Sequence, residues 1–302
     1  MTYLLVSDLD GTLLTSRKEL SQRSVQVLDE FIAVGGMFSI ATARMAYGCE
    51  HLLGFDLRLP GVVMNGAALY SFAERRYLQT QPIADAGVIA ASNAVAEAGA
   101  GAFVYGVDRG QIRLGCTARE DLAWEQYNSV RARAAAGPAT ILGPRNWERL
   151  GEIVYLAVVG SQAQLLAVAD LAAGIPELAG HPYHNVYTGN DCLEFSSNAA
   201  GKQQAVRGLQ QRVGADRLIV FGDNRNDLGM MNLADRSFAP EGSAPRGTAG
   251  GRRDHRQQRR RWRRAHHPTL LTHVAGLNRP AQHRAPETNL DPAIDAYQRL
   301  DV

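Results

Sequence analysis

The chain has 302 residues, of which 45% are hydrophobic and 21% charged, a balance typical of a globular protein large enough for two domains. No apolar run approaches the roughly 18 residues of a membrane span, and the N-terminus does not resemble a signal peptide. The three cysteines, Cys49, Cys116 and Cys192, are odd in number and far apart, which indicates reduced thiols. We therefore expect a cytoplasmic protein without a membrane partner.

The formal net charge of +2 is unevenly distributed along the chain. Residues 241–302 hold 12 Lys and Arg against 6 Asp and Glu, so the first 240 residues hold 20 against 24. A protein that binds nucleic acid usually carries a basic face on its folded domain. The acidic main body therefore makes nucleic acid an unlikely partner.

The first part of the chain has the pattern of a strand, a helix and a second strand. Residues 3–7 form a short apolar run that ends in the polar segment Asp8-Leu9-Asp10-Gly11-Thr12, as at the end of a buried strand. Residues 21–34 have helical spacing, and Gly35-Gly36 predict the end of that helix before a strand at residues 37–41.

Two further apolar runs also end in polar residues. The run at residues 61–64 precedes Asn65-Gly66-Ala67, and the run at residues 218–221 precedes Gly222-Asp223. The carboxyl ends of parallel strands meet at one edge of a sheet, where ligands bind in open α/β folds. We expect four parallel strands to bring these polar residues together.

The pattern changes in residues 82–184, where helical stretches alternate with strand-like runs. The helical stretches lie at residues 86–98 and 162–173, and the strand-like runs at residues 102–107 and 153–159. We expect a separate α/β cap that shuts out water and selects substrates. The predicted fold class is α/β, with a Rossmann-like parallel-sheet core in residues 1–81 and 185–240 and the inserted cap in residues 82–184.

Asp8 and Asp10 lie where the chain turns at a strand end, so both carboxyl groups can reach one site. One carboxylate can attack phosphorus while the other protonates the leaving alcohol and later activates water. Mg²⁺ prefers hard oxygen ligands and neutralises the repulsion between carboxylate and phosphate. Asp8 and Asp223 form the obvious pair of ligands, with Asp227 close behind.

Transfer of a phosphoryl group also needs donors aimed at its oxygens. Thr42 follows the second strand, although a helix cap explains a threonine there equally well. Lys202 stands at a predicted helix start and is one of only two lysines, the other being Lys18. In a chain that otherwise uses arginine, a lysine indicates a need for a compact point charge.

Five motifs, in this order and spacing, resemble those of the haloacid dehalogenase superfamily. They are DLDGT at 8–12, SIAT at 39–42, NGA at 65–67, Gly201-Lys202 and GDNRND at 222–227. Together with the long insertion, they are similar to the Cof-type subgroup with a large α/β cap (class IIB). The resemblance covers residues 3 to about 240 and implies a phosphatase for small phosphorylated metabolites, with Mg²⁺ as its cofactor.

The resemblance also implies a role for each motif residue. Asp8 is the nucleophile and Asp10 the acid and base. The implied phosphate ligands are Thr42, Lys202 and Asn226, and the implied substrate contacts are Arg44, Asn65 and Gly66. The implied metal ligands are Asp8, Asp223 and the carbonyl of Asp10, and Asp227 supports these ligands. Ala43 departs from the family, which usually has glycine there.

Some alternatives remain open at this stage. A structural turn explains Asn65 about as well as a substrate contact does, and helix capping competes with metal support for Asp227. For the whole chain, a phosphomutase of the same superfamily or a non-catalytic phosphate-binding or nucleic-acid-binding protein is the alternative to a phosphatase.

The basic tail, residues 241–302, does not match the end of the resembling family. Its composition fits a disordered or anion-binding segment, but a third interpretation is favoured. If residues 251–265 are translated one base later with GC-rich codons, they can give AAAIIGNNADDGVA, which is similar to a family segment before the last helix. The hypothesis is a frameshift near residues 241–243.

Overall fold

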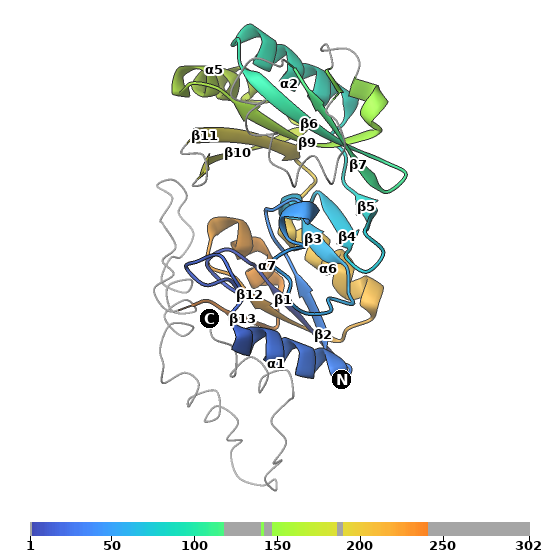
Figure 1. Cartoon of the computed structure of the whole chain (residues 1–302). Coiled ribbons are helices and arrows are strands. Elements are labelled where there is room, and N and C mark those ends of the chain that lie inside the picture. The colour runs from blue at the N-terminus through green and yellow to red at the C-terminus, as the bar shows by residue number, and fades with distance from the viewer. Residues whose placement is uncertain (1, 118–139, 142–146, 186–189, 241–302) are drawn as a thin grey trace, which may run out of the picture. The chain divides into compact units, whose positions relative to one another are not determined.

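The computed structural model describes residues 2–117, 140–141, 147–185 and 190–240. It divides into two compact units, each treated separately below (Figure 1). The first unit comprises Met1–Thr42, Leu52–Leu59 and Lys202–Val302, and the second comprises Ala43–His51 and Pro60–Gly201. The tail at 241–302 lies outside the described residues. The boundaries drawn from the sequence for core and cap stay a prediction.

The first unit is built on a four-stranded parallel sheet, with α1 beside β2 and α7 beside β12 (Figure 1). Its order is β13 (Arg236–Phe238), β12 (Arg217–Phe221), β1 (Tyr3–Ser7) and β2 (Met37–Ile40). Leu4 of β1 is fully buried and pairs with Leu218 on one side and Met37 on the other. An apolar central strand with helices around it explains why this run is continuously hydrophobic.

The described residues of the first unit form three α-helices, and the helix predicted at residues 21–34 is one of them. They are α1 (Gln22–Ala33), α6 (Lys202–Val213) and α7 (Leu228–Leu233), with a short 3₁₀ turn, η4 (Arg225–Asp227), before α7. The Ser21 hydroxyl accepts a hydrogen bond from the Ser24 N–H and caps α1. Gly35, with φ of 90°, follows its last turn, in the left-handed conformation that glycine adopts without strain.

The run at 61–64 does not join the parallel sheet, so the prediction of a parallel strand there was wrong. Strand β3 (Gly61–Val63) pairs antiparallel with β4 (Ala68–Ser71), which pairs antiparallel with β5 (Arg76–Thr80). The turn η2 (Met64–Gly66) between β3 and β4 has φ values of 51°, 53° and 95°. These positive angles reverse the chain at once, and an apolar run by itself does not show which partner a strand takes.

The second unit contains a six-stranded mixed sheet. Its order is β10 (Leu178–Asn185), β11 (Asn190–Ser197), β9 (Glu152–Val159), β6 (Gly101–Asp108), β7 (Gln111–Cys116) and β8 (Thr140–Ile141). The described part of the second unit also forms the helices α2 (Asp85–Glu97) and α5 (Gln162–Ala172) and the short turns η1 (Ala46–Gly48) and η3 (Trp147–Leu150). Both predicted helices and both predicted strands of this region are confirmed.

Alternate residues of β6 and β9 belong to two different apolar clusters of the second unit. Val104 and Leu156 pack with the buried sides of α2 and α5, whereas Phe103, Tyr155 and Ala157 pack in a cluster with β3 to β5. Since successive strand residues point to opposite faces, both faces of this sheet are covered.

The described residues also bear on two predictions about the chain's environment. Cys49 and Cys116 are buried and are not joined in a disulfide, as expected, while the side chain of Cys192 is outside the described part. No helix in the described ranges is both long and apolar enough to cross a membrane.

Candidate active site

The site begins in the loop that follows β1. The carbonyl of Leu9 accepts hydrogen bonds from the N–H groups of Thr12, Leu13 and Leu14, at 3.3, 3.1 and 2.8 Å. The three leucines of this loop are buried, so apolar side chains anchor the turn. The Asp8 N–H donates to the carbonyl of Phe221 at 2.9 Å, which joins the ends of β1 and β12.

Gly11 and Thr12 place Asp223 beside this loop. Gly11 has a φ of 84°, and a Cβ added there would lie 2.4 Å from Oδ2 of Asp223. The Thr12 hydroxyl donates to Oδ1 of Asp223 at 3.1 Å. Sequence reasoning gave Thr12 no role, although its place in the DLDGT segment was a usable signal.

Lys202 joins two aspartates in the interior of the first unit. Its Nζ lies 2.6 Å from Oδ1 of Asp8 and 2.7 Å from Oδ1 of Asp227. All three residues are at most 5% exposed. A buried charge is strongly disfavoured unless it is paired, so the loss of any one of these three side chains would remove a pairing partner from at least one buried charge.

The second oxygen of Asp227 holds the loop after β12. Oδ2 accepts hydrogen bonds from the N–H groups of Asp223 and Asn224, at 3.1 and 3.0 Å. The Asn224 carboxamide accepts from the Arg225 N–H at 2.8 Å, and Asn224 and Asp227 form a capping box in which each side chain accepts from the other residue's N–H. A Cβ on Gly222 would lie 2.6 Å from that of Asp227. Asp227 thus caps a turn and also pairs with Lys202.

Three carboxylates converge at one point of the first unit. One oxygen each from Asp8, Asp223 and Asp227 lies within 4.8 Å of the others. All of these donors are hard oxygens, the type that Mg²⁺ prefers. The residues therefore fit a magnesium ion held by Asp8 and Asp223, with Asp227, already bonded to Lys202 and two amides, fixing the surrounding loop.

The electrostatics of the cluster set an unusual pKa for Asp8. Burial raises the pKa of Asp8 from 3.8 to about 7; Lys202 opposes this rise, and the nearby Asp227 and Asp223 carboxylates add to it. Burial, with Asp227, likewise raises the pKa of Asp223, against a hydrogen bond from Thr12. Three carboxylates facing one ammonium leave an excess of negative charge, which a bound cation would neutralise.

The other predicted residues of the first unit lie in different settings. Asp10 follows the same turn as Asp8, and its carboxylate contacts Lys18. Thr42 is buried just beyond the carboxyl end of β2. Asn226 is exposed within η4, one residue before Asp227. The roles of these three residues stay predictions.

The three predicted substrate contacts belong to the second unit. The Met64 N–H donates to the Arg44 carbonyl at 3.0 Å, so the segments holding Arg44 and Asn65 lie side by side. Asn65 and Gly66 have φ values of 53° and 95°, a backbone that favours Asn and Gly for conformational reasons alone. Their substrate role stays a prediction.

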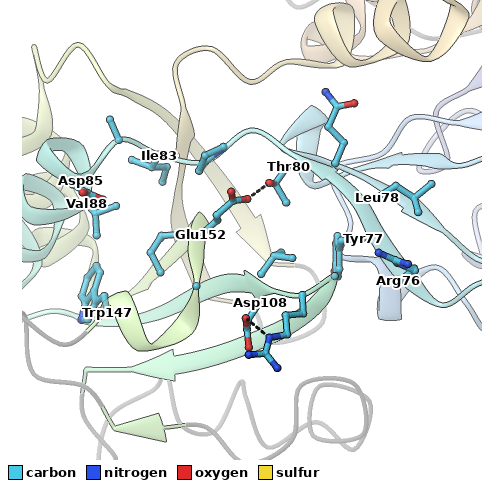
Figure 2. Close-up of a pocket in the computed structure, with 18 of the residues that line it drawn as sticks. Arg76, Tyr77, Leu78, Thr80, Ile83, Asp85, Val88, Asp108, Trp147 and Glu152 are labelled. Atoms are coloured by element: carbon cyan, nitrogen blue, oxygen red, sulfur yellow. Dashed lines mark hydrogen bonds and ion pairs between the residues drawn. The ribbon is translucent and has the colours of Figure 1, made fainter. Parts of the chain in front are cut away.

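A cavity of about 1410 Å³ also lies within the second unit, and no predicted site residue lines it. Figure 2 shows Trp147 and Val88 at one side and the Thr80 hydroxyl donating to the Glu152 carboxylate. All of its lining residues belong to the second unit, and none of the clustered aspartates is among them.

Comparison with known proteins places these features in a family. The model of the haloacid dehalogenase-like hydrolases matches residues 5–246, whereas no curated protein matches the chain. A haloacid dehalogenase-like hydrolase from Bacteroides thetaiotaomicron is similar in structure, with a TM-score of 0.62 and 19% identity, over 81% of this chain and 90% of that chain. A haloacid dehalogenase-like hydrolase from B. subtilis has a TM-score of 0.57 and 18% identity, over 80% of this chain and 90% of that chain.

A third similar structure is that of BT4131, described as a sugar phosphatase of subclass IIB. Its TM-score is 0.57 at 16% identity, over 81% of this chain and 89% of that chain. These likenesses confirm the predicted fold class, a parallel-sheet α/β core with an inserted cap. Since the family model spans Asp8, Lys202, Asp223 and Asp227, the chain belongs to the haloacid dehalogenase-like hydrolases.

Proposed function

We propose that the protein is a magnesium-dependent phosphatase that hydrolyses small phosphomonoesters through an aspartyl-phosphate on Asp8. The observation that carries the proposal is the buried Lys202, whose ammonium contacts Asp8 at 2.6 Å beside Asp223 and Asp227. A nucleophilic carboxylate needs nearby positive charge to approach a phosphate. Sugar phosphates are the first substrates to test, because the structurally similar BT4131 is described as a sugar phosphatase.

The residues divide the reaction into two steps. In the first, an Asp8 oxygen forms a bond to phosphorus while the ester bond breaks, and Asp10 gives a proton to the leaving oxygen. In the second, Asp10 takes a proton from water as the water oxygen bonds to phosphorus, and the bond between phosphorus and the Asp8 oxygen breaks, which releases inorganic phosphate and restores the Asp8 carboxylate. Lys202 and Thr42 donate hydrogen bonds to the phosphoryl oxygens. Mg²⁺, when bound by the aspartates, supplies charge neutralisation.

The proposal is tested with a panel of aryl and sugar phosphates in the presence and absence of MgCl₂. We expect phosphate release that needs Mg²⁺ and disappears in Asp8→Asn. In Asp10→Asn, a radiolabelled aryl phosphate should leave label on the protein that hydroxylamine removes, because the acyl phosphate then lacks its general base. A folded wild-type protein that releases no phosphate from any ester would overturn the proposal.

The same experiment separates the alternatives. A phosphomutase would give an isomerised sugar phosphate without free phosphate. A non-catalytic phosphoacceptor would keep its label even with Asp10 intact. Either result would replace hydrolysis as the function of the site.

A further inference from the structure

The two lysines of the chain each contact one aspartate of the DLDGT segment. Lys202 contacts Asp8, as described above, and Nζ of Lys18 lies 3.0 Å from Oδ1 of Asp10. The side chains of Lys18 and Asp10 are 38% and 35% exposed, so water partly screens their attraction. Sequence reasoning assigned no role to Lys18. Only two of the 32 Lys and Arg residues are lysines, and this rarity was the feature that could have indicated a role.

Backbone contacts within one turn hold Asp10 and Lys18 close together, independently of the contact between their side chains. Asp10 forms a bridge with Leu14, and the chain then reverses in a turn. In that turn the Lys18 N–H donates to the Thr15 carbonyl at 2.8 Å, and the Thr15 N–H donates to the Glu19 carbonyl at 2.9 Å. A pair whose backbones are already fixed loses less conformational entropy on forming than two free side chains do.

Lys18 itself adopts a left-handed backbone conformation, with a φ of 61°. This conformation carries a small strain for any residue other than glycine. Methionine or arginine at position 18 would bear the same strain, so these substitutions change the end of the side chain while the turn keeps its shape.

We propose that Lys18 is a positioning residue that holds the Asp10 carboxyl where it can exchange a proton with the leaving oxygen of the substrate. The inference rests on the proposed function, since it assigns Lys18 to the acid and base step of that reaction. A carboxyl at a partly exposed loop position has several rotamers, and proton transfer requires a donor within hydrogen-bond distance. The charged hydrogen bond to Oδ1 selects one of them.

The test compares two substrates that differ in their need for an acid. The leaving oxygen of para-nitrophenyl phosphate departs readily as an anion, whereas that of benzyl phosphate must be protonated. We expect Lys18→Met to lower kcat/KM about tenfold for benzyl phosphate and less than about twofold for para-nitrophenyl phosphate, because a misplaced acid forfeits part of its usual contribution. Lys18→Arg should recover most of the loss.

Arg17→Met provides the matched control. Arg17 belongs to the same turn, pairs with Glu19 at 3.7 Å and is 83% exposed, so its loss should change neither substrate. The ratio of the two kcat/KM values does not depend on the fraction of active protein. A partly unfolded Lys18→Met variant would therefore still show the selective loss.

A double-mutant cycle decides whether Lys18 acts through Asp10. In an Asp10→Asn background, Lys18→Met should cause no further loss, because the group it positions is already gone. Equal losses for both substrates, or a full further loss in that background, would overturn the proposal in favour of direct substrate binding. Wild-type protein that hydrolyses neither ester would overturn the proposed function itself, whereas active protein unaffected by Lys18→Met would overturn only this inference.

Discussion

Nζ of Lys202 and Oδ1 of Asp8 lie 2.6 Å apart in the interior of the first unit, although 194 positions separate the residues in sequence. The same ammonium contacts Asp227 at 2.7 Å, so one cation serves two buried carboxylates. Stability and chemistry therefore depend on the same three side chains, and substitutions can separate the two contributions.

Replacing Lys202 with methionine should destabilise the protein strongly. The change leaves Asp8 and Asp227 buried without their counter-ion, and we expect a loss of about 3–5 kcal/mol in the free energy of unfolding near neutral pH. Urea unfolding in EDTA measures it. The matched control is Lys18→Met, whose exposed pair should contribute less than about 1 kcal/mol. Equal losses in the two variants would contradict this prediction.

The pH dependence of stability should report the raised pKa of Asp8. Since its folded pKa of about 7 exceeds its ordinary value of 3.8, ionisation of Asp8 disfavours the folded state, and that cost grows as pH rises from 3.8 towards about 7. Asp8→Asn removes the cost. In EDTA, the stability of Asp8→Asn relative to wild type should therefore increase by about 3 kcal/mol between about pH 5 and about pH 8. A difference independent of pH would count against this assignment.

Magnesium should stabilise the wild-type protein against heat. Binding to the folded state alone contributes about 2.7 kcal/mol at a concentration of about 100 times Kd, which differential scanning fluorimetry detects as a rise in Tm. Asp223→Asn should greatly reduce the rise. Asp56→Asn is the control, because Asp56 is exposed and pairs with Arg58. The metal assignment fails if Asp223→Asn keeps the full effect.

Alanine substitutions at two glycines with similar backbone angles should distinguish backbone strain from steric overlap. Gly11 and Gly35 have φ values of 84° and 90°, but a Cβ on Gly11 would meet Asp223 whereas one on Gly35 would meet nothing within 4 Å. Gly35→Ala should lower the free energy of unfolding by about 1 kcal/mol, from strain alone. Gly11→Ala should lower it further and abolish phosphate release by displacing Asp223. Similar stability and activity of the two variants would exclude the overlap as a cause.

The tail hypothesis leads to a prediction about the coding DNA. The family match ends at residue 246, close to the proposed frameshift at residues 241–243. Among the described residues, β13 is the outer strand of the parallel sheet, and an uncovered sheet edge favours aggregation. A frame-corrected protein should therefore have a higher Tm and aggregate less. Resequencing the DNA checks the premise, which fails if the alternate frame is open but lacks family-like residues.

Sequence alone determined several helices and strands of the fold and indicated the residues proposed for the chemistry. The helices α1, α2 and α5, the start of α6 and the strands β1, β2 and β12 follow from apolar periodicity, glycine stops and caps, which act over a few residues, whereas β13 was not predicted. Asp8 and Asp223 were recognisable because polar residues that follow buried strands meet at the edge of a parallel sheet.

Only the tertiary structure decided which side chains meet. The antiparallel pairing of β3, the hydrogen bond from Thr12 to Asp223, the contact of Lys18 with Asp10 and the double pairing of Lys202 all depend on contacts across turns or between distant segments. Periodicity records whether a residue is buried but not which neighbour it contacts, because burial is a property of one position and pairing is a property of two. That is why the sequence indicated four aspartates and Lys202, while the fold showed that this lysine is shared by the buried Asp8 and Asp227.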